Sequence, residues 1–122
     1  MESPHKGRKG LRRIWNAFGY SVDGIAAAIR HEDAFRQEML LALVMIPLAI
    51  VLPVQAAARA LMIACVLLVL IVELLNSGLE AAVDRISLED HALAKRAKDI
   101  GSAAVFLALL NLAAVWLAIL AG

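Results

Sequence analysis

The chain has 122 residues, 62% of them hydrophobic, and a mean hydropathy of +0.79, which is too apolar for a water-soluble domain of this length. Its formal net charge of +1 comes from 12 Lys and Arg against 11 Asp and Glu, unevenly distributed along the chain. The single cysteine, Cys65, excludes an intramolecular disulfide. These totals predict one integral-membrane domain over residues 1–122. We expect no cleaved signal peptide, because the basic start lacks a continuous apolar run.

The first predicted element is an amphipathic helix over residues 11–30. Apolar residues recur at spacings of three and four from Leu11 to Ile29, while Arg12 and Arg13 lie on other faces. A basic helix with one apolar face typically lies on a membrane surface. A helix packed on the rest of the protein remains an alternative interpretation.

Three membrane spans are predicted after this helix, at about residues 36–54, 57–84 and 98–121. The first contains Pro47 and Pro53, so we expect it to be kinked or short. The second begins after a brief loop, and the third carries no charged side chain over residues 100–121. The fold class is therefore an all-α membrane protein with an N-terminal surface helix.

The distribution of positive charge predicts the orientation of the spans. All but one of the twelve Lys and Arg residues precede the first span or lie between the second and third, and the exception is Arg59. Because cytoplasmic segments of membrane proteins carry the excess of Lys and Arg, the N-terminus and the loop over residues 84–99 are predicted to be cytoplasmic.

The most informative stretch is the C-terminal part of the second span, where an apolar helix becomes acidic. Glu73, Asn76, Glu80 and Asp84 follow each other at spacings of three, four and four, and so share one helix face. Ionisable groups inside membrane helices cost a few kcal/mol each and usually mark function. Glu73 is the deepest of these residues and Asp84 is the nearest to water.

Glu73 and Glu80 are two helical turns apart, about 10.5 Å along the axis, and cannot easily share one metal ion. A deep carboxylate suits a general base, and a shallow one suits Mg²⁺ carrying a nucleotide phosphate. Glu32, before the first span, is a second candidate metal carboxylate. The stretch over residues 85–99 has polar side chains suited to phosphate and ribose, and neither common ATP-binding motif is present. These polar side chains are Glu89, Asp90, His91, Lys95, Lys98 and Asp99.

Structural roles remain open for several of these residues. Asn76 could bond another helix, and Ser77 and Gly78 could allow close helix contact. Asp84 and Arg85 could form an ordinary ion pair near the helix end. His91 could be a plain loop residue, and Tyr20 and Trp116 could be interfacial anchors.

Residues 73–85, E-L-L-N-S-G-L-E-A-A-V-D-R, closely resemble the E-[IL]-[IL]-N-[ST]-x-[IL]-E-x-[VA]-V-D signature of the small integral-membrane prokaryotic diacylglycerol kinases. Two further stretches agree with the family, Glu32 with residues 34–38 and residues 97–105. The resemblance covers about residues 13–120.

This resemblance implies a homotrimer in the bacterial inner membrane that phosphorylates diacylglycerol with MgATP, giving phosphatidic acid at sites shared between protomers. It implies that Glu73 is the catalytic base or positions the lipid hydroxyl, with Asn76 as its supporting polar residue. Glu32 and Glu80 would be the Mg²⁺ carboxylates.

The resemblance also implies two sets of contacts. The nucleotide contacts would be Arg13, Tyr20, Glu32, Glu80, Glu89, Asp90, His91, Lys98 and Asp99. The lipid contacts would be Arg13, Ser21, Ala34, Phe35, Arg36, Gln37, Glu38, Arg59, Glu73, Ser102 and Trp116. Residues 35–38 and 100–102 resemble the diacylglycerol branch, and an undecaprenol kinase of the same family is the nearest alternative.

The residues themselves also favour an oligomer, because three helices cannot both bury an acidic face and enclose a site, so faces from several chains should converge. Outside the kinase class, a small proton-coupled exporter would also use one intramembrane glutamate. The crowding of acidic residues at one end argues against it. A catalytically silent regulatory membrane subunit is a third hypothesis.

Overall fold

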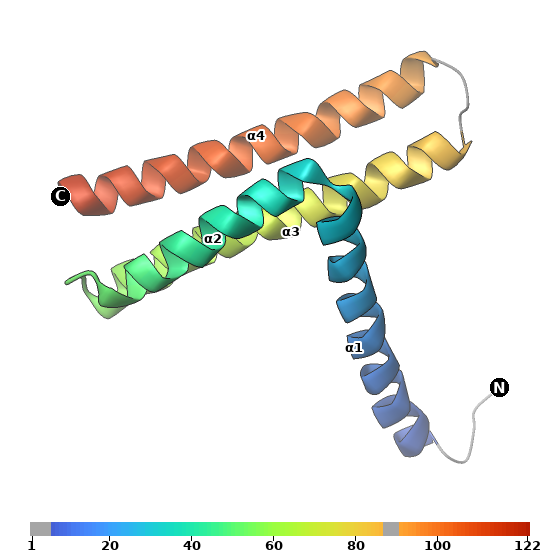
Figure 1. The fold of residues 1–122 in the computed structure, drawn as a ribbon, viewed down its shortest axis with the longest axis horizontal. Helices are drawn as coiled ribbons and strands as arrows, with labels where there is room; N and C mark the ends of the chain where they lie inside the picture. The colour runs from blue at the N-terminus through green and yellow to red at the C-terminus, as the bar shows by residue number, and fades with distance from the viewer. Residues whose placement is uncertain (1–5, 87–90) are drawn as a thin grey trace.

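The protein is built entirely from helices in the part of the chain that the structure, a computed structural model, describes, residues 6–86 and 91–122 (Figure 1). The helices are α1 (Lys6–His31), α2 (Asp33–Val51), α3 (Ala56–Ile86) and α4 (Ala92–Ala121). The predicted all-α class, with one amphipathic helix before three apolar ones, is confirmed.

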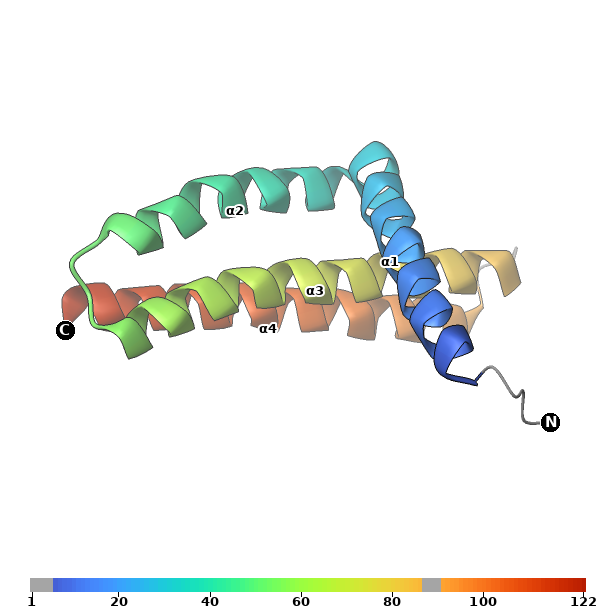
Figure 2. The same ribbon diagram turned by 90° about the horizontal axis from the view of Figure 1, so that it is seen from below.

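Helices α2, α3 and α4 are long and apolar enough to cross a membrane. At 1.5 Å per residue, the 19 residues of α2 extend about 28 Å, close to the thickness of a bilayer's hydrocarbon core. The 31 residues of α3 and the 30 of α4 extend about 45 Å. Both project past the junction of α1 and α2, at the end of the bundle where α3 finishes and α4 begins (Figure 2). Those projecting turns are therefore suited to a polar environment.

Helix α3 is the centre of the packing, because it contacts both α2 and α4. The core combines small residues of α2 with larger ones from the other two helices. Lipid is as apolar as the side chains and provides no hydrophobic drive for helix association, so membrane helices depend on close packing. Small residues allow the helices to approach closely. The buried core residues are Ala42, Ala49, Met62, Cys65, Val66, Val69, Ala108, Leu112 and Trp116.

The antiparallel register of α3 and α4 is marked by three contacts along their length. Asp84 pairs with Lys98 near one end, and Asn76 meets Gly101 further in. Toward the other end, the Trp116 indole N–H donates to the Met62 carbonyl at 3.1 Å. This register brings the acidic end of α3 beside the first turns of α4.

The helix ends differ from the predicted spans in ways that proline and helix capping explain. Pro47 lies inside α2 without ending it, but α2 stops at Val51, before Pro53, and not at residue 54. The guanidinium of Arg59 then donates to the carbonyls of Ala49, Leu52 and Val54, which have no helical partners at this turn. Arg59 therefore stabilises the connection between α2 and α3.

The predicted loop over residues 84–99 is shorter than expected. Residues 84–86 continue α3, and α4 already begins at Ala92. His91 is the N-cap, and its ring accepts a hydrogen bond from the Leu93 N–H at 3.1 Å. Lys98 and Asp99 consequently lie on a helix and not in a loop.

Helix α1 leaves the other three at a steep angle (Figures 1 and 2). Apart from its last turns, where Ala28 is buried, its apolar residues have no cover within the protomer, and Trp15 is 74% exposed. The alternative of a helix packed along the rest of the protein is therefore wrong for the single chain. An apolar face without cover fits the predicted surface helix.

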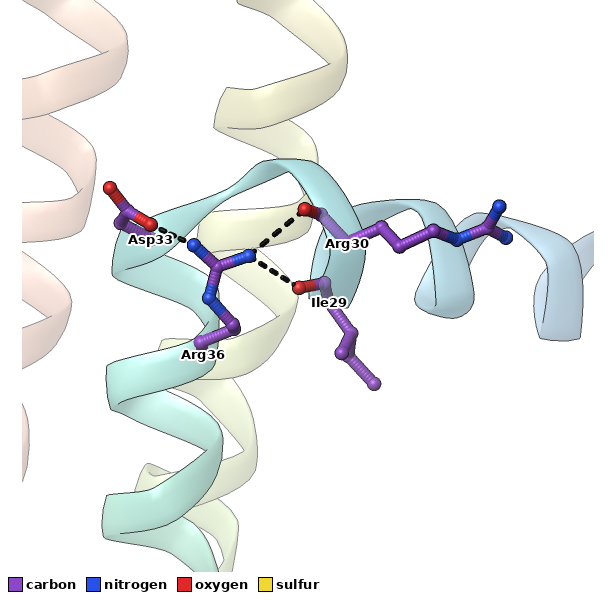
Figure 3. Close-up of polar contacts among 4 residues, drawn as sticks. All are labelled: Ile29, Arg30, Asp33 and Arg36. Carbon is purple, nitrogen blue, oxygen red and sulfur yellow. Dashed lines mark hydrogen bonds and ion pairs between the residues drawn. The ribbon is translucent and has the colours of Figure 1, made fainter.

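The junction of α1 and α2, which we call the elbow, consists of residues 29–36. The Arg36 guanidinium donates to the carbonyls of Ile29 at 2.7 Å and Arg30 at 3.0 Å, and it pairs with Asp33 (Figure 3). Glu32 separates the two helices in an extended conformation. The last turn of α1 is thus tied to the first turn of α2.

Candidate functional site

The acidic face of α3 changes from buried to exposed along the helix. Glu73 is 5% exposed and is the one charged residue buried among the described residues. Asn76 and Glu80 are half-buried, and Asp84 is exposed. Burial inside the protomer thus decreases along this face from Glu73 to Asp84, while the predicted depth of Glu73 in the membrane remains a prediction.

Glu38 of α2 faces Glu73 of α3. The two carboxyl groups are close enough to interact directly. One oxygen of Glu38, Oε2, is buried and has no conventional hydrogen-bond donor among the described residues. The sequence resemblance assigns Glu38 to the lipid contacts, whereas its proximity to Glu73 is a finding of the structure. Two carboxyl groups from different helices thus meet level with the elbow.

A groove of about 770 Å³ lies between α1 and α3, and none of the four residues of the acidic face lines it. Its wall is mostly small and apolar, with Ile25 and Ala28 from α1 and Leu74 and Ala81 from α3. A mostly apolar groove with a few polar groups is the usual form of a ligand-binding site. The polar residues on its lining are Ser21, His31, Glu32 and Ser77.

Glu32 occupies the N-cap position of α2 but makes no capping hydrogen bond through its side chain. N-cap side chains normally accept a bond from the first turn of the helix, so this carboxylate remains available for another partner. It lines the groove together with residues 77, 78 and 81, which flank Glu80 on α3. Glu80 itself does not line this groove.

Glu32 and Glu80 remain the predicted metal carboxylates. No group of three or more His, Cys, Asp or Glu is gathered for a metal among the described residues. Mg²⁺ typically binds through one or two carboxylates plus substrate phosphates and water, so a site of two carboxylates fits Mg²⁺ bound together with a nucleotide.

The first turns of α4 carry the other charged groups of the region. Lys98 pairs with Asp84 at 2.5 Å, and Lys95 pairs with Asp99 at 2.7 Å. Both pairs are partly exposed, at the projecting end of the bundle. His91 is exposed and close by in sequence, while Glu89 and Asp90 lie outside the described residues.

Arg13 and Tyr20 line a second groove, also about 770 Å³, on the polar side of α1. All of its lining comes from α1, including Lys9, Arg12 and Asn16. Within one protomer, this groove has no wall from another helix. The structure therefore does not bring Arg13 and Tyr20 together with Lys98 in a groove that they share.

Several predicted lipid contacts lie apart from the acidic face. Arg59 and Trp116 are toward the opposite end of the bundle, where they bond backbone carbonyls, and Ser102 is exposed on α4. In the first turns of α2, Phe35 is 1% exposed, whereas Ala34 and Gln37 are exposed. Lipid contact by these residues remains a prediction.

Gly101 of α4 is a residue at this site that the sequence analysis did not single out. It is buried against the side chain of Asn76, and a Cβ at this position would lie 2.2 Å from Asn76 Oδ1. The available signal was a lone glycine in a long apolar helix, which is costly without a packing reason.

The sequence was also compared with known proteins. Residues 19–120 match the family model described as prokaryotic diacylglycerol kinase. A diacylglycerol kinase of Pseudomonas aeruginosa is 59% identical over 120 residues, covering 98% of both chains. The Escherichia coli K12 diacylglycerol kinase is 50% identical, covering 88% of both chains. One from Helicobacter pylori is 43% identical over 95% of this chain and 90% of its own length.

Proposed function

The chain belongs to the prokaryotic diacylglycerol kinase family, and from this premise we propose that it transfers the terminal phosphoryl group of ATP to diacylglycerol, giving phosphatidic acid. The observation that best supports this function is a buried carboxylate, Glu73, on the same helix whose residues 74, 77, 78 and 81 line an apolar groove. Diacylglycerol has an apolar body and a single free hydroxyl, which match an apolar groove beside a carboxylate.

Glu73 is the catalytic base in this proposal. Its carboxylate accepts the proton of the lipid hydroxyl as the hydroxyl oxygen forms a bond to the γ-phosphorus. The bond between that phosphorus and the bridging oxygen breaks, and ADP leaves. Asn76, one helical turn away, supports the reacting groups. Enzymatic phosphoryl transfer depends mainly on positioning and electrostatics, so fixed side chains are the main contribution of the protein.

Glu32 and Glu80 hold Mg²⁺ in this proposal, together with the nucleotide phosphates. The ion would neutralise phosphate charge during transfer. The free carboxylate of Glu32 beside the groove supports this assignment. The nucleotide contacts are Arg13, Tyr20, Glu32, Glu80, Glu89, Asp90, His91, Lys98 and Asp99. The lipid contacts are Arg13, Ser21, residues 34–38, Arg59, Glu73, Ser102 and Trp116.

The site operates at the cytoplasmic face of the inner membrane in this proposal, since ATP is cytoplasmic and the excess of Lys and Arg favours that side. Residues 1–122 act as one kinase domain. The active unit is a homotrimer with shared sites. The groove on α1, whose lining comes from that helix alone, supports an assembly in which another chain provides the missing wall.

The test is phosphate transfer from labelled MgATP by the purified protein in mixed micelles, with dioleoylglycerol and undecaprenol as competing acceptors. We expect phosphatidic acid as the main product. A preference for undecaprenol would show that undecaprenol is the lipid substrate, and the proposed mechanism of phosphoryl transfer would still hold. Absence of transfer to either acceptor by a folded oligomer would reject the kinase function.

The assigned base is tested by Glu73→Gln, which keeps the shape of the side chain. We expect turnover to fall by about 10²- to 10⁴-fold, the usual contribution of a general base, with the oligomer unchanged in size-exclusion chromatography. Unchanged turnover would reject the role of Glu73. The exporter hypothesis instead requires substrate efflux that this variant abolishes.

A further inference from the structure

Asn76 and Gly101 face each other across the interface of α3 and α4, where no space remains for another atom. A Cβ on Gly101 would lie 2.2 Å from Asn76 Oδ1, 3.3 Å from Asn76 Cγ and 3.0 Å from Leu79 Cδ2. Gly101 is buried, and Asn76 Oδ1 is buried without a hydrogen-bond donor among the described residues. The amide of Asn76 therefore packs directly against the backbone of Gly101.

Backbone conformation does not explain this glycine. None of the glycines in the described part of the chain has a positive φ, so Gly101 has an ordinary helical conformation that alanine would also adopt. Glycine inside a helix is less stable than alanine at the same position. The side chains of Asn76 and Leu79 occupy the space that a Cβ at this position would need, and Asn76 is by far the nearer.

We propose that Gly101 is a positioning residue for phosphoryl transfer, because its missing side chain fixes the amide of Asn76 on the face of α3 that carries Glu73. The inference rests on the proposed function, since it requires Asn76 to support the reaction at Glu73. Gly101 itself touches no reacting atom. It acts through Asn76, which is three residues after Glu73 and therefore adjacent to it on the helix surface.

The contact geometry also predicts how the protein would respond to a methyl group at position 101. The closest atom is the end of the Asn76 side chain, which can rotate, and not part of a backbone. The amide would have to move by about 1 Å or more to reach ordinary van der Waals contact. We therefore expect Gly101→Ala to keep the fold but displace Asn76. A displacement of about 1 Å at an active site can cost up to 100-fold in rate.

The experiment is a double-mutant cycle of Gly101→Ala and Asn76→Ala, assayed in mixed micelles with dioleoylglycerol and MgATP. We expect Gly101→Ala alone to lower kcat about 10- to 100-fold, with KM for both substrates within about twofold. In the Asn76→Ala background, where the amide is gone, the same change should have little further effect, because the remaining close atom is the end of the flexible Leu79 side chain at 3.0 Å. Gly19→Ala is the matched control, since a Cβ at this α1 glycine meets nothing within 4 Å.

Each outcome of the cycle decides a different point. Full activity of Gly101→Ala with an impaired Asn76→Ala would overturn the positioning role and leave the proposed function intact. The same fold-loss in both backgrounds would also overturn it, because a merely structural glycine does not depend on Asn76. Full activity of Asn76→Ala would remove Asn76 from the proposed mechanism, and the positioning role with it.

Assembly provides a second readout if Gly101→Ala is poorly folded. In that case, the double variant should recover the oligomer yield of Asn76→Ala, because truncating Asn76 makes room for the methyl group. Recovery measured by size-exclusion chromatography supports the contact as described. Equal loss of oligomer in both backgrounds contradicts it.

Discussion

Lys98 of α4 lies 2.5 Å from the carboxylate of Asp84 on α3, at the end of the bundle that projects past the elbow. The side chains of Lys98 and Asp84 are 40% and 62% exposed, so water screens their attraction. Exposed ion pairs contribute about 0–1 kcal/mol to stability. The pair therefore contributes little to the association of the two helices, and its main effect is to fix the position of the Lys98 ammonium.

Because Lys98 is a proposed nucleotide contact, Asp84→Asn should affect nucleotide binding more than folding. We expect KM for MgATP to rise about three- to tenfold, which corresponds to roughly 1 kcal/mol of lost positioning, with thermal stability in detergent nearly unchanged. KM for diacylglycerol should not change, because Asp84 is outside the apolar groove. A large fall in stability without a change in KM would show that the pair is a structural link.

The proposed role of Glu32 in Mg²⁺ binding can be tested separately from helix capping. It is at the N-cap of α2 without a capping hydrogen bond, so Glu32→Gln should not incur the usual loss of about 1 kcal/mol for a lost cap. We expect unchanged thermal stability and a rise of about tenfold or more in the Mg²⁺ concentration for half-maximal activity. The measurement is a magnesium titration at saturating ATP, and an unchanged titration would remove Glu32 from the metal site.

Much of this arrangement could be predicted from the sequence, because hydrophobic periodicity and charge placement act along one chain. The three apolar helices follow from that pattern. The contact between Glu38 and Glu73, and the seating of Asn76 on Gly101, depend on the register between helices. Side-chain packing determines this register, and spacing along one helix carries no information about it. The start of α4 at Ala92 was missed because charged residues there resembled a loop.

The elbow contacts of Arg36 predict that this residue controls the orientation of α1. Its guanidinium bonds two carbonyls of the last turn of α1 and the Asp33 carboxylate, a set that lysine cannot reproduce with one compact ammonium. We expect Arg36→Lys to raise KM for diacylglycerol several-fold, on the order of 1 kcal/mol per lost hydrogen bond. Spin-label distances from α1 to α3 should broaden in the same variant.

Asp33→Asn is the matched control for the elbow. It removes the ion pair but leaves both carbonyl contacts of Arg36, and Asp33 is 86% exposed. We expect spin-label distances and KM close to those of the unmodified protein. If Asp33→Asn instead reproduces the effect of Arg36→Lys, the ion pair and not the carbonyl contacts would set the angle of α1.

The apolar face of α1 predicts where the two tryptophans lie relative to the bilayer. Trp15 is 74% exposed and stacks on Phe18 at 6.3 Å, whereas Trp116 is 7% exposed within the core. A surface helix would place Trp15 among the lipid headgroups, where tryptophan is favoured. In Trp116→Phe, the remaining fluorescence should be quenched most strongly by lipids brominated close to the glycerol. In Trp15→Phe, the remaining buried indole of Trp116 should be quenched only weakly at that depth. Strong acrylamide quenching of Trp15 in vesicles, measured in Trp116→Phe, would instead place α1 in water.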